Sequence, residues 1–234
     1  KDLTRTVQSH GGKIAAQLMH PSFNAPSALS GVQPVAASPI ASRRFRELPR
    51  ELRAEEIEKI VERFVDAARR AQEAGCDAVQ LHCAHSHHLL GSFLSPLHNK
   101  RTDEFGGDIH GRLKLPLEVI RRIRAKVGPG FPILLRISGD EYEPGGRSLG
   151  ETQYIAPFFV EAGVDALNIS AGTTSLGSVA PPMGSTAGIY APLAAAIKEV
   201  VKIPVISVGR IFTPWVAEHI LSSGKADMVA MARA

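Results

Sequence analysis

The sequence is poor in cysteine and aromatic residues, and it lacks long hydrophobic runs. Cys76 and Cys83 are its two cysteines, which excludes a disulfide framework. No apolar run approaches the roughly 18 residues that indicate a membrane span. The chain does not open with a basic and then apolar segment, as a secretory signal does. We therefore expect a cytoplasmic protein with no membrane contact.

A predominance of one charge is also missing. The sequence has 27 Lys and Arg residues against 23 Asp and Glu residues, and both signs are interspersed. This distribution lacks the basic patch of a nucleic-acid-binding protein, so we expect no nucleic acid partner. With 234 residues, 44% of them hydrophobic, the chain can bury one sizeable core, which predicts one domain over residues 1–234.

What is present is a repeated local plan of an amphipathic helix, a glycine turn with an acidic residue, and a short apolar run. Three copies of the turn and run occupy residues 74–81, 162–169 and 223–231. Glycine favours the left-handed conformation that ends a helix, and a fully apolar run is typical of a buried parallel strand. Three further strands are predicted at 13–18, 131–137 and 203–208, which makes six in all.

Helices alternate with these strands. Apolar residues recur at three- and four-residue steps most clearly over 55–74, and less regularly over 117–127, 152–162, 191–201 and 214–223. Residues 21–52 show no helical period and predict a long loop. Alternation of this kind predicts an α/β fold with a parallel sheet, either an open doubly wound sheet or part of a TIM barrel.

Polar residues gather where the predicted strands end, which is where parallel α/β folds bind ligands. The strand-end residues, in chain order, are Gln17, His20, His82, His85, His87, Arg136, Asp140, Asn168, Ser170, Gly209, Arg210, Ala232 and Arg233. The last two strand ends, around Gly209 and Ala232, have the small residues that let main-chain N–H groups approach a phosphate. The structural alternative is that Gly209 only turns the chain and the arginines cap helices.

The histidines His82, His85, His87 and His88 also allow a metal hypothesis, because imidazole is a common metal ligand. No carboxylate or cysteine array with zinc spacing accompanies them, so we expect no metal. A pair of imidazoles that bind a substrate oxygen is the favoured interpretation.

Several longer segments form a specific set. They are Gln17-Leu18-Met19-His20, Leu81-His82-Cys83-Ala84-His85, residues 93–107 with Arg112, Leu135-Arg136-Ile137-Ser138, Val208-Gly209-Arg210-Ile211 and residues 226–233. This set resembles the old yellow enzyme family of NADH:flavin oxidoreductases. Residues 181–183 and Tyr190-Ala191-Pro192-Leu193 are most similar to its branch of 2-enoate and 2,4-dienoyl-CoA reductases.

The resemblance implies an FMN-binding (β/α)8 TIM barrel that takes hydride from NADH or NADPH and reduces an activated alkene. It implies that Gln17, Arg136 and Ser170 lie at the flavin ring, and that Gly209, Arg210, Ala232 and Arg233 hold its phosphate. His82 and His85 match the pair that binds the substrate carbonyl or carboxylate oxygen. Association into a homo-oligomer would also suit the family.

Two departures from the family pattern affect the prediction. His87 stands where the family has a tyrosine proton donor, and a histidine can donate a proton near neutral pH. The match begins at the family's third strand, so residues 1–234 correspond to strands 3 to 8, without the first two strand–helix units and the last helix. Six strands alone would leave two open edges and an unfilled barrel. Two alternatives therefore stay open, a flavin-binding barrel without ene-reductase turnover and a barrel metallohydrolase.

Overall fold

The sheet is parallel throughout and follows chain order. The computed structural model describes residues 1–41, 45–86, 88–173 and 184–232. Its six main strands, in spatial order, are β1 (Ala15–Leu18), β4 (Ala78–Cys83), β5 (Ile133–Ser138), β6 (Ala166–Ser170), β7 (Val205–Val208) and β8 (Met228–Ala230). Each strand adds to the same edge, whereas a doubly wound sheet reverses its order. The open doubly wound alternative is therefore wrong.

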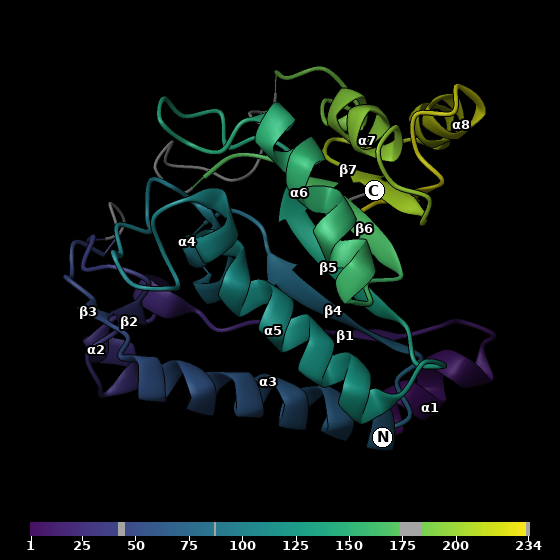
Figure 1. Cartoon of the computed structure of the whole chain (residues 1–234). Coiled ribbons are helices and arrows are strands. Elements are labelled where there is room, and N and C mark those ends of the chain that lie inside the picture. Colours follow the sequence, from purple (N-terminus) through teal and green to yellow (C-terminus); the bar gives the residue numbers. More distant parts are fainter. Residues whose placement is uncertain (42–44, 87, 174–183, 233–234) are drawn as a thin grey trace.

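Helices between the strands form a connected layer along the sheet (Figure 1). They are α3 (Ala54–Glu73), α5 (Ile109–Val127), α6 (Leu149–Ala162), α7 (Ala191–Lys198) and α8 (Pro214–Ser222), and each packs on the next from α3 to α7. All five were predicted, but α5 and α6 begin earlier than expected. Asp108 and Ser148 cap their first turns by accepting main-chain N–H bonds, and α5 continues through Pro116.

The expectation of a long loop over residues 21–52 was wrong in part. This segment contains η1 (Ser22–Asn24), α2 (Ser27–Ser30) and a two-stranded parallel sheet of β2 (Val35–Ala36) and β3 (Arg50–Glu51). The buried Arg101 guanidinium donates to the carbonyls of Ala37 and Leu52 at 3.2 and 2.7 Å. Such long-range bonds from a side chain to the main chain leave no periodic trace in the sequence.

Two further helices of the described residues were missed. They are α1 (Asp2–Ser9) and α4 (Leu89–Leu94), which follows β4. Every residue of α4 is buried, so it lacks the polar face that produces a helical period.

The repeated glycine and aspartate have separate structural roles. Gly75, Gly163 and Gly224 have φ values of 86°, 112° and 70°, which confirms the left-handed helix ends predicted from the repeat. Each aspartate accepts a main-chain hydrogen bond at or just before the start of the neighbouring strand. Asp165 accepts the Ile133 N–H at 2.7 Å and Asp227 accepts the Val205 N–H at 2.8 Å, while Asp77 accepts the Ile14 N–H at 2.9 Å. The repeat thus fixes the amino ends of three strands against their neighbours.

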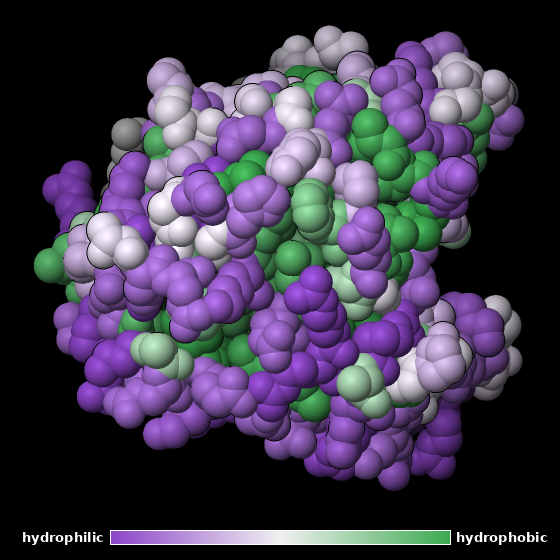
Figure 2. All heavy atoms as spheres, in the orientation of Figure 1, coloured by the Kyte–Doolittle hydropathy of each residue, from purple (hydrophilic) through white to green (hydrophobic). Residues whose placement is uncertain are grey.

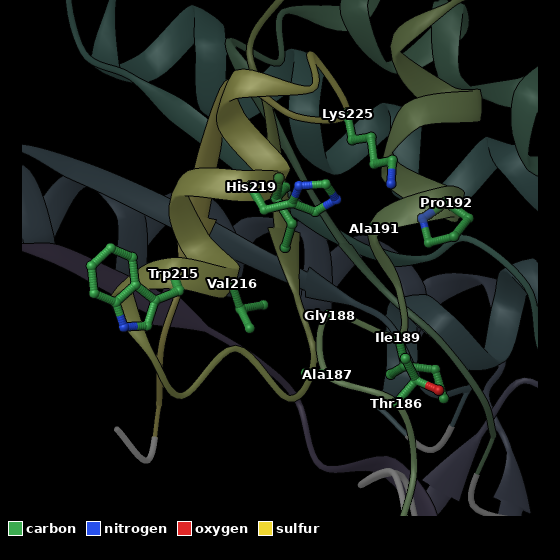
Figure 3. Close-up of a pocket in the computed structure, with 11 residues that line it drawn as sticks. Thr186, Ala187, Gly188, Ile189, Ala191, Pro192, Trp215, Val216, His219 and Lys225 are labelled. Atoms are coloured by element: carbon green, nitrogen blue, oxygen red, sulfur yellow. The ribbon is translucent and has the colours of Figure 1, made fainter.

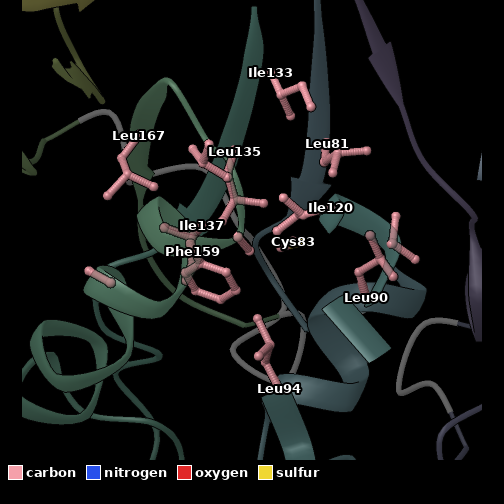
Figure 4. Packing of buried hydrophobic residues seen from close by; sticks show 14 of the residues in the cluster. Leu81, Cys83, Leu90, Leu94, Ile120, Ile133, Leu135, Ile137, Phe159 and Leu167 are labelled. Carbon is pink, nitrogen blue, oxygen red and sulfur yellow. The ribbon is translucent and has the colours of Figure 1, made fainter. Parts of the chain in front are cut away.

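The core lies between the sheet and the helices. Alternate strand residues such as Leu81, Leu135 and Leu167 point toward Ile120 of α5 and Phe159 of α6 (Figure 4). Hydrophilic side chains cover much of the molecular face in Figure 2, and hydrophobic ones show between them. Cys83 is buried in this core and Cys76 is half-buried, and both are free thiols.

The other face of the sheet has polar residues on β1, β4, β5 and β6. Because strand side chains alternate, the partners of the core residues point away from the helices. We call this set the inner face, and its members are Gln17, Gln80, His82, Arg136, Asn168 and Ser170. At the sheet edges, Gln17 of β1 is exposed and so is Met228 of β8. Among the described residues, neither β1 nor β8 pairs with a further strand on its outer side, as expected for six strands.

Candidate active site

Two histidines meet at the carboxyl end of β4. The rings of His82 and His85 lie 5.8 Å apart between centroids, and the side chains are buried with 4% and 3% exposure. The Ala84 N–H donates to Nδ1 of His82 at 3.3 Å, which places the proton of a neutral His82 ring on Nε2. His88 packs against the same ring, with 4.0 Å between centroids. His82 can therefore donate a hydrogen bond from Nε2.

His85 contacts residues from the next two strands. Its Nε2 lies 3.4 Å from Nη2 of Arg136 on β5 and 3.2 Å from Oγ of Ser170 on β6. Because a guanidinium only donates, Nε2 of His85 is the acceptor in the Arg136 contact. The structure thus brings together four residues predicted at three neighbouring strand ends, His82, His85, Arg136 and Ser170.

Arg136 is a partly desolvated cation. Its side chain contacts the His85 ring and the Ser170 hydroxyl, which are not anionic. Among the described residues, no carboxylate forms an ion pair with it, and its buried Nε has no hydrogen-bond partner. Burial lowers the pKa of the guanidinium below its ordinary value. The site therefore offers positive charge to an anionic or electron-rich ligand.

Gln80 and Asn168 are two inner-face amides for which the sequence suggested no role. Gln17 donates from Nε2 to Oε1 of Gln80 at 2.5 Å, across the β1–β4 pair. Asn168 lies opposite Arg136 in the β5–β6 register, and its buried Oδ1 has no partner among the described residues. Gln80 could have been found from its place two residues before His82, on the same side of the strand.

The carboxyl ends of β7 and β8 lie side by side, because these strands pair through Val208 and Ala230. Gly209 and Arg210 have φ values of 112° and 53°, and a Cβ at Gly209 would overlap the Tyr190 ring. Gly209 therefore turns the chain, which both the phosphate prediction and the structural alternative allow. Thr213 caps α8 by accepting the Val216 N–H at 3.4 Å. A phosphate site at Gly209, Arg210 and Ala232 stays a prediction.

Three further predictions fall outside the described residues. They concern His87 as proton donor, Arg233 at the phosphate, and residues 181–183 as a mark of the subgroup. Within the described part of the chain, no group of three or more His, Cys, Asp or Glu side chains could hold a metal ion. In that same part, no helix has both the length and the apolar character to cross a bilayer.

A pocket lies between α7 and α8, and neither His82 nor His85 lines it (Figure 3). Its volume is about 460 Å³, and Trp215, His219 and Lys225 line it together with Gly188 and Pro192. None of the residues predicted to contact flavin or substrate lines this pocket. We therefore locate the candidate active site at the strand ends, not here.

A strand–helix sheet in chain order, with polar residues at consecutive carboxyl ends, is the arrangement of barrel enzymes that bind ligands at that face. The chain belongs to the NADH:flavin oxidoreductase / NADH oxidase family, which it matches over residues 1–234. This membership confirms the resemblance stated from the motifs.

Similar proteins share the sequence and the fold. The NADH oxidase of Thermoanaerobacter brockii is 44% identical over 234 residues, which cover 99% of this chain and 36% of the relative. The structure of a 2-naphthoyl-CoA reductase complex has a TM-score of 0.93 at 26% identity, covering 99% of this chain and 37% of that one. An old yellow enzyme homologue from Zymomonas mobilis has a TM-score of 0.81 at 28% identity, with 98% and 65% covered. The chain thus spans about a third of the length of the NADH oxidase and of the 2-naphthoyl-CoA reductase.

Proposed function

We propose that the intact protein is an FMN-dependent oxidoreductase that passes hydride from NADH or NADPH to a carbon–carbon double bond. The substrate class is an α,β-unsaturated carbonyl compound or an enoyl-CoA-type thioester. The observation that carries the proposal is the pair of buried imidazoles, 5.8 Å apart, beside Arg136. Family membership and the likeness to a 2-naphthoyl-CoA reductase support it.

The inner face has the chemistry that a flavin needs. Arg136 supplies a desolvated positive charge, and Asn168 has a buried carbonyl oxygen without a described partner. Gln17 and Gln80 add amide groups that can bond the polar edge of an isoalloxazine ring. Bound FMN would supply the hydride-carrying group, while Gly209, Arg210, Ala232 and Arg233 are the proposed phosphate contacts.

The histidine pair would activate the substrate. Nε2–H of His82 donates to the carbonyl oxygen, with His85 beside it, and this bond withdraws electron density from the alkene. The β-carbon then becomes the better hydride acceptor. We propose His87 as the donor of the proton to the α-carbon, because imidazole titrates near neutral pH.

The strand order also supports a barrel. We propose that the six strands are consecutive units of a (β/α)8 TIM barrel, family strands 3 to 8, within one FMN-binding domain over residues 1–234. The single direction of strand addition supports this proposal, as does the TM-score of 0.81 to the old yellow enzyme homologue.

Variants of the two histidines test the proposal. With 2-cyclohexen-1-one as alkene, His82→Ala and His85→Ala should slow substrate reduction by about 100-fold, because each removes a group at the developing oxyanion. Flavin reduction by NADH should stay within about twofold of the wild type. Stopped-flow absorbance of each half-reaction measures both effects. Equal losses in the two half-reactions would refute the assignment of the histidines to the substrate.

His87→Ala separates proton donation from carbonyl binding. The variant should slow alkene reduction while flavin reduction by NADH is unchanged, and the apparent affinity for the enone should stay close to that of the wild type. A steady-state comparison of kcat with KM for the enone gives the result. A raised KM with unaltered kcat would instead assign His87 to binding.

A further inference from the structure

The Ser138 hydroxyl joins three strand ends. Ser138 is the last residue of β5 and is 1% exposed. Its Oγ accepts the His85 N–H at 2.9 Å and donates to the Gly172 carbonyl at 3.1 Å. One side chain thus links the segment after β4 with the segment after β6.

The segment that Ser138 bonds has an unfavourable main-chain conformation. His85 and Ser86 are consecutive residues with φ values of 64° and 44°. Residues other than glycine adopt this left-handed region only when surrounding contacts stabilise it. A parallel bridge between His85 and Thr173 and the bond to Ser138 are such contacts.

The main chain and the ring of His85 are held by different groups. Arg136 and Ser170 contact the imidazole at Nε2, whereas Ser138 contacts the main-chain N–H. Ser138 is itself fixed, since its carbonyl accepts a bond from Nη1 of the buried Arg147 at 2.9 Å. Its hydroxyl can therefore fix the position of the His85 main chain, from which the imidazole ring extends.

We propose that Ser138 is a positioning residue for His85. Its hydroxyl holds the left-handed turn at residues 85–86, and this turn aims the imidazole at the substrate oxygen beside His82. The inference rests on the proposed function for the role of His85, and on the hydrogen bonds alone for the role of Ser138.

Amide hydrogen exchange of the intact protein tests the structural step. In Ser138→Ala the His85 amide should exchange at least about tenfold faster than in the wild type, because it loses its acceptor. Ser207→Ala is the matched control, since Ser207 is a buried serine on β7, which β6 separates from β5. Unchanged exchange at His85 in Ser138→Ala would overturn the proposal.

A double-mutant cycle tests the functional step. Ser138→Ala should lower kcat/KM for 2-cyclohexen-1-one about tenfold, with flavin reduction by NADH unchanged. In a His85→Ala background the same change should have no further effect, because the group that it positions is gone. If the double variant loses kcat/KM by the product of the two single-variant factors, Ser138 acts independently of His85. That result also overturns the proposal.

The two arms keep this inference separate from the proposed function. A wild type that never reduces the enone refutes the function, while the exchange experiment still decides whether Ser138 holds His85. If Ser138→Ala does not fold, Ser138→Cys retains a side chain of similar size with a weak hydrogen-bonding sulfur. Ser138→Cys should speed exchange of the His85 amide and lower kcat/KM, each by less than Ser138→Ala does. Wild-type values of both quantities would contradict the assignment.

Discussion

Arg136 is the residue whose environment most directly indicates a ligand. Its guanidinium is half-buried, and its contacts to His85 and Ser170 supply no opposite charge. A buried cation that lacks an anionic partner costs free energy in the folded protein. An electron-rich ligand at this position would recover part of that cost.

Arg136→Met exchanges this charge for an apolar side chain of similar length. The melting temperature of the FMN-free protein should stay the same or rise, because the desolvation cost disappears. The Kd for FMN should increase about 100-fold, as expected for the loss of roughly 2–3 kcal/mol from a charged hydrogen bond. Thermal melts and FMN fluorescence titrations measure the two effects. Arg121→Met, an exposed substitution on α5, is the control; an unchanged Kd in Arg136→Met would contradict the assignment.

The sequence was sufficient to predict the residues at the strand ends, but not how they are held. His82, Arg136 and Ser170 come together because the carboxyl ends of parallel strands meet at one edge. The contributions of Gln80 and Ser138 depend on strand register and on the left-handed turn at His85. Neither feature follows from composition or periodicity.

At the scale of elements, the repeated aspartates connect neighbouring strands. The pKa of Asp77 is lowered from 3.8 to about 2, first by the Ile14 N–H and then by the Gln8 and Lys13 side chains. The folded state therefore favours the carboxylate. Its contribution to stability is present above pH 3.8 and is lost as the pH falls through about 2.

Asp77→Ala should thus destabilise the protein in a pH-dependent way. At pH 7 the urea midpoint of the variant should lie below that of the wild type, and the gap should narrow as the pH falls from about 4 toward 2. Urea titrations at pH 7 and pH 3 make the comparison. Asp66→Ala removes an exposed carboxylate from α3, and its urea midpoint should differ much less from that of the wild type at both pH values. A gap for Asp77→Ala that is the same at both pH values would exclude the proposed linkage.

The strongly periodic α3 was predicted closely, whereas several elements without a period were missed. α3 presents a continuous apolar stripe, so its extent was predicted to within one residue at each end. The fully buried α4 and the two-residue strands β2 and β3 have no comparable pattern. These elements are stabilised by tertiary contacts, which single-sequence periodicity does not report.

At the scale of the whole molecule, one chain-ordered sheet separates two tasks. Its apolar side packs against the helices, and the aspartates bond the amino ends of its strands. Its polar inner face collects histidine, arginine and amide side chains toward the carboxyl ends. Stability and chemistry are thus assigned to different faces and ends of the same strands, as in barrel enzymes generally.

The most direct measurement is an anaerobic half-reaction of the intact protein with its flavin. The protein is reduced with one equivalent of NADH or NADPH, mixed with 2-cyclohexen-1-one, and followed by visible absorbance and product analysis. We expect the oxidised flavin spectrum to return without oxygen, and cyclohexanone to form in equal amount. A flavin that stays reduced with this enone and with an enoyl-CoA thioester, until oxygen is admitted, would contradict it.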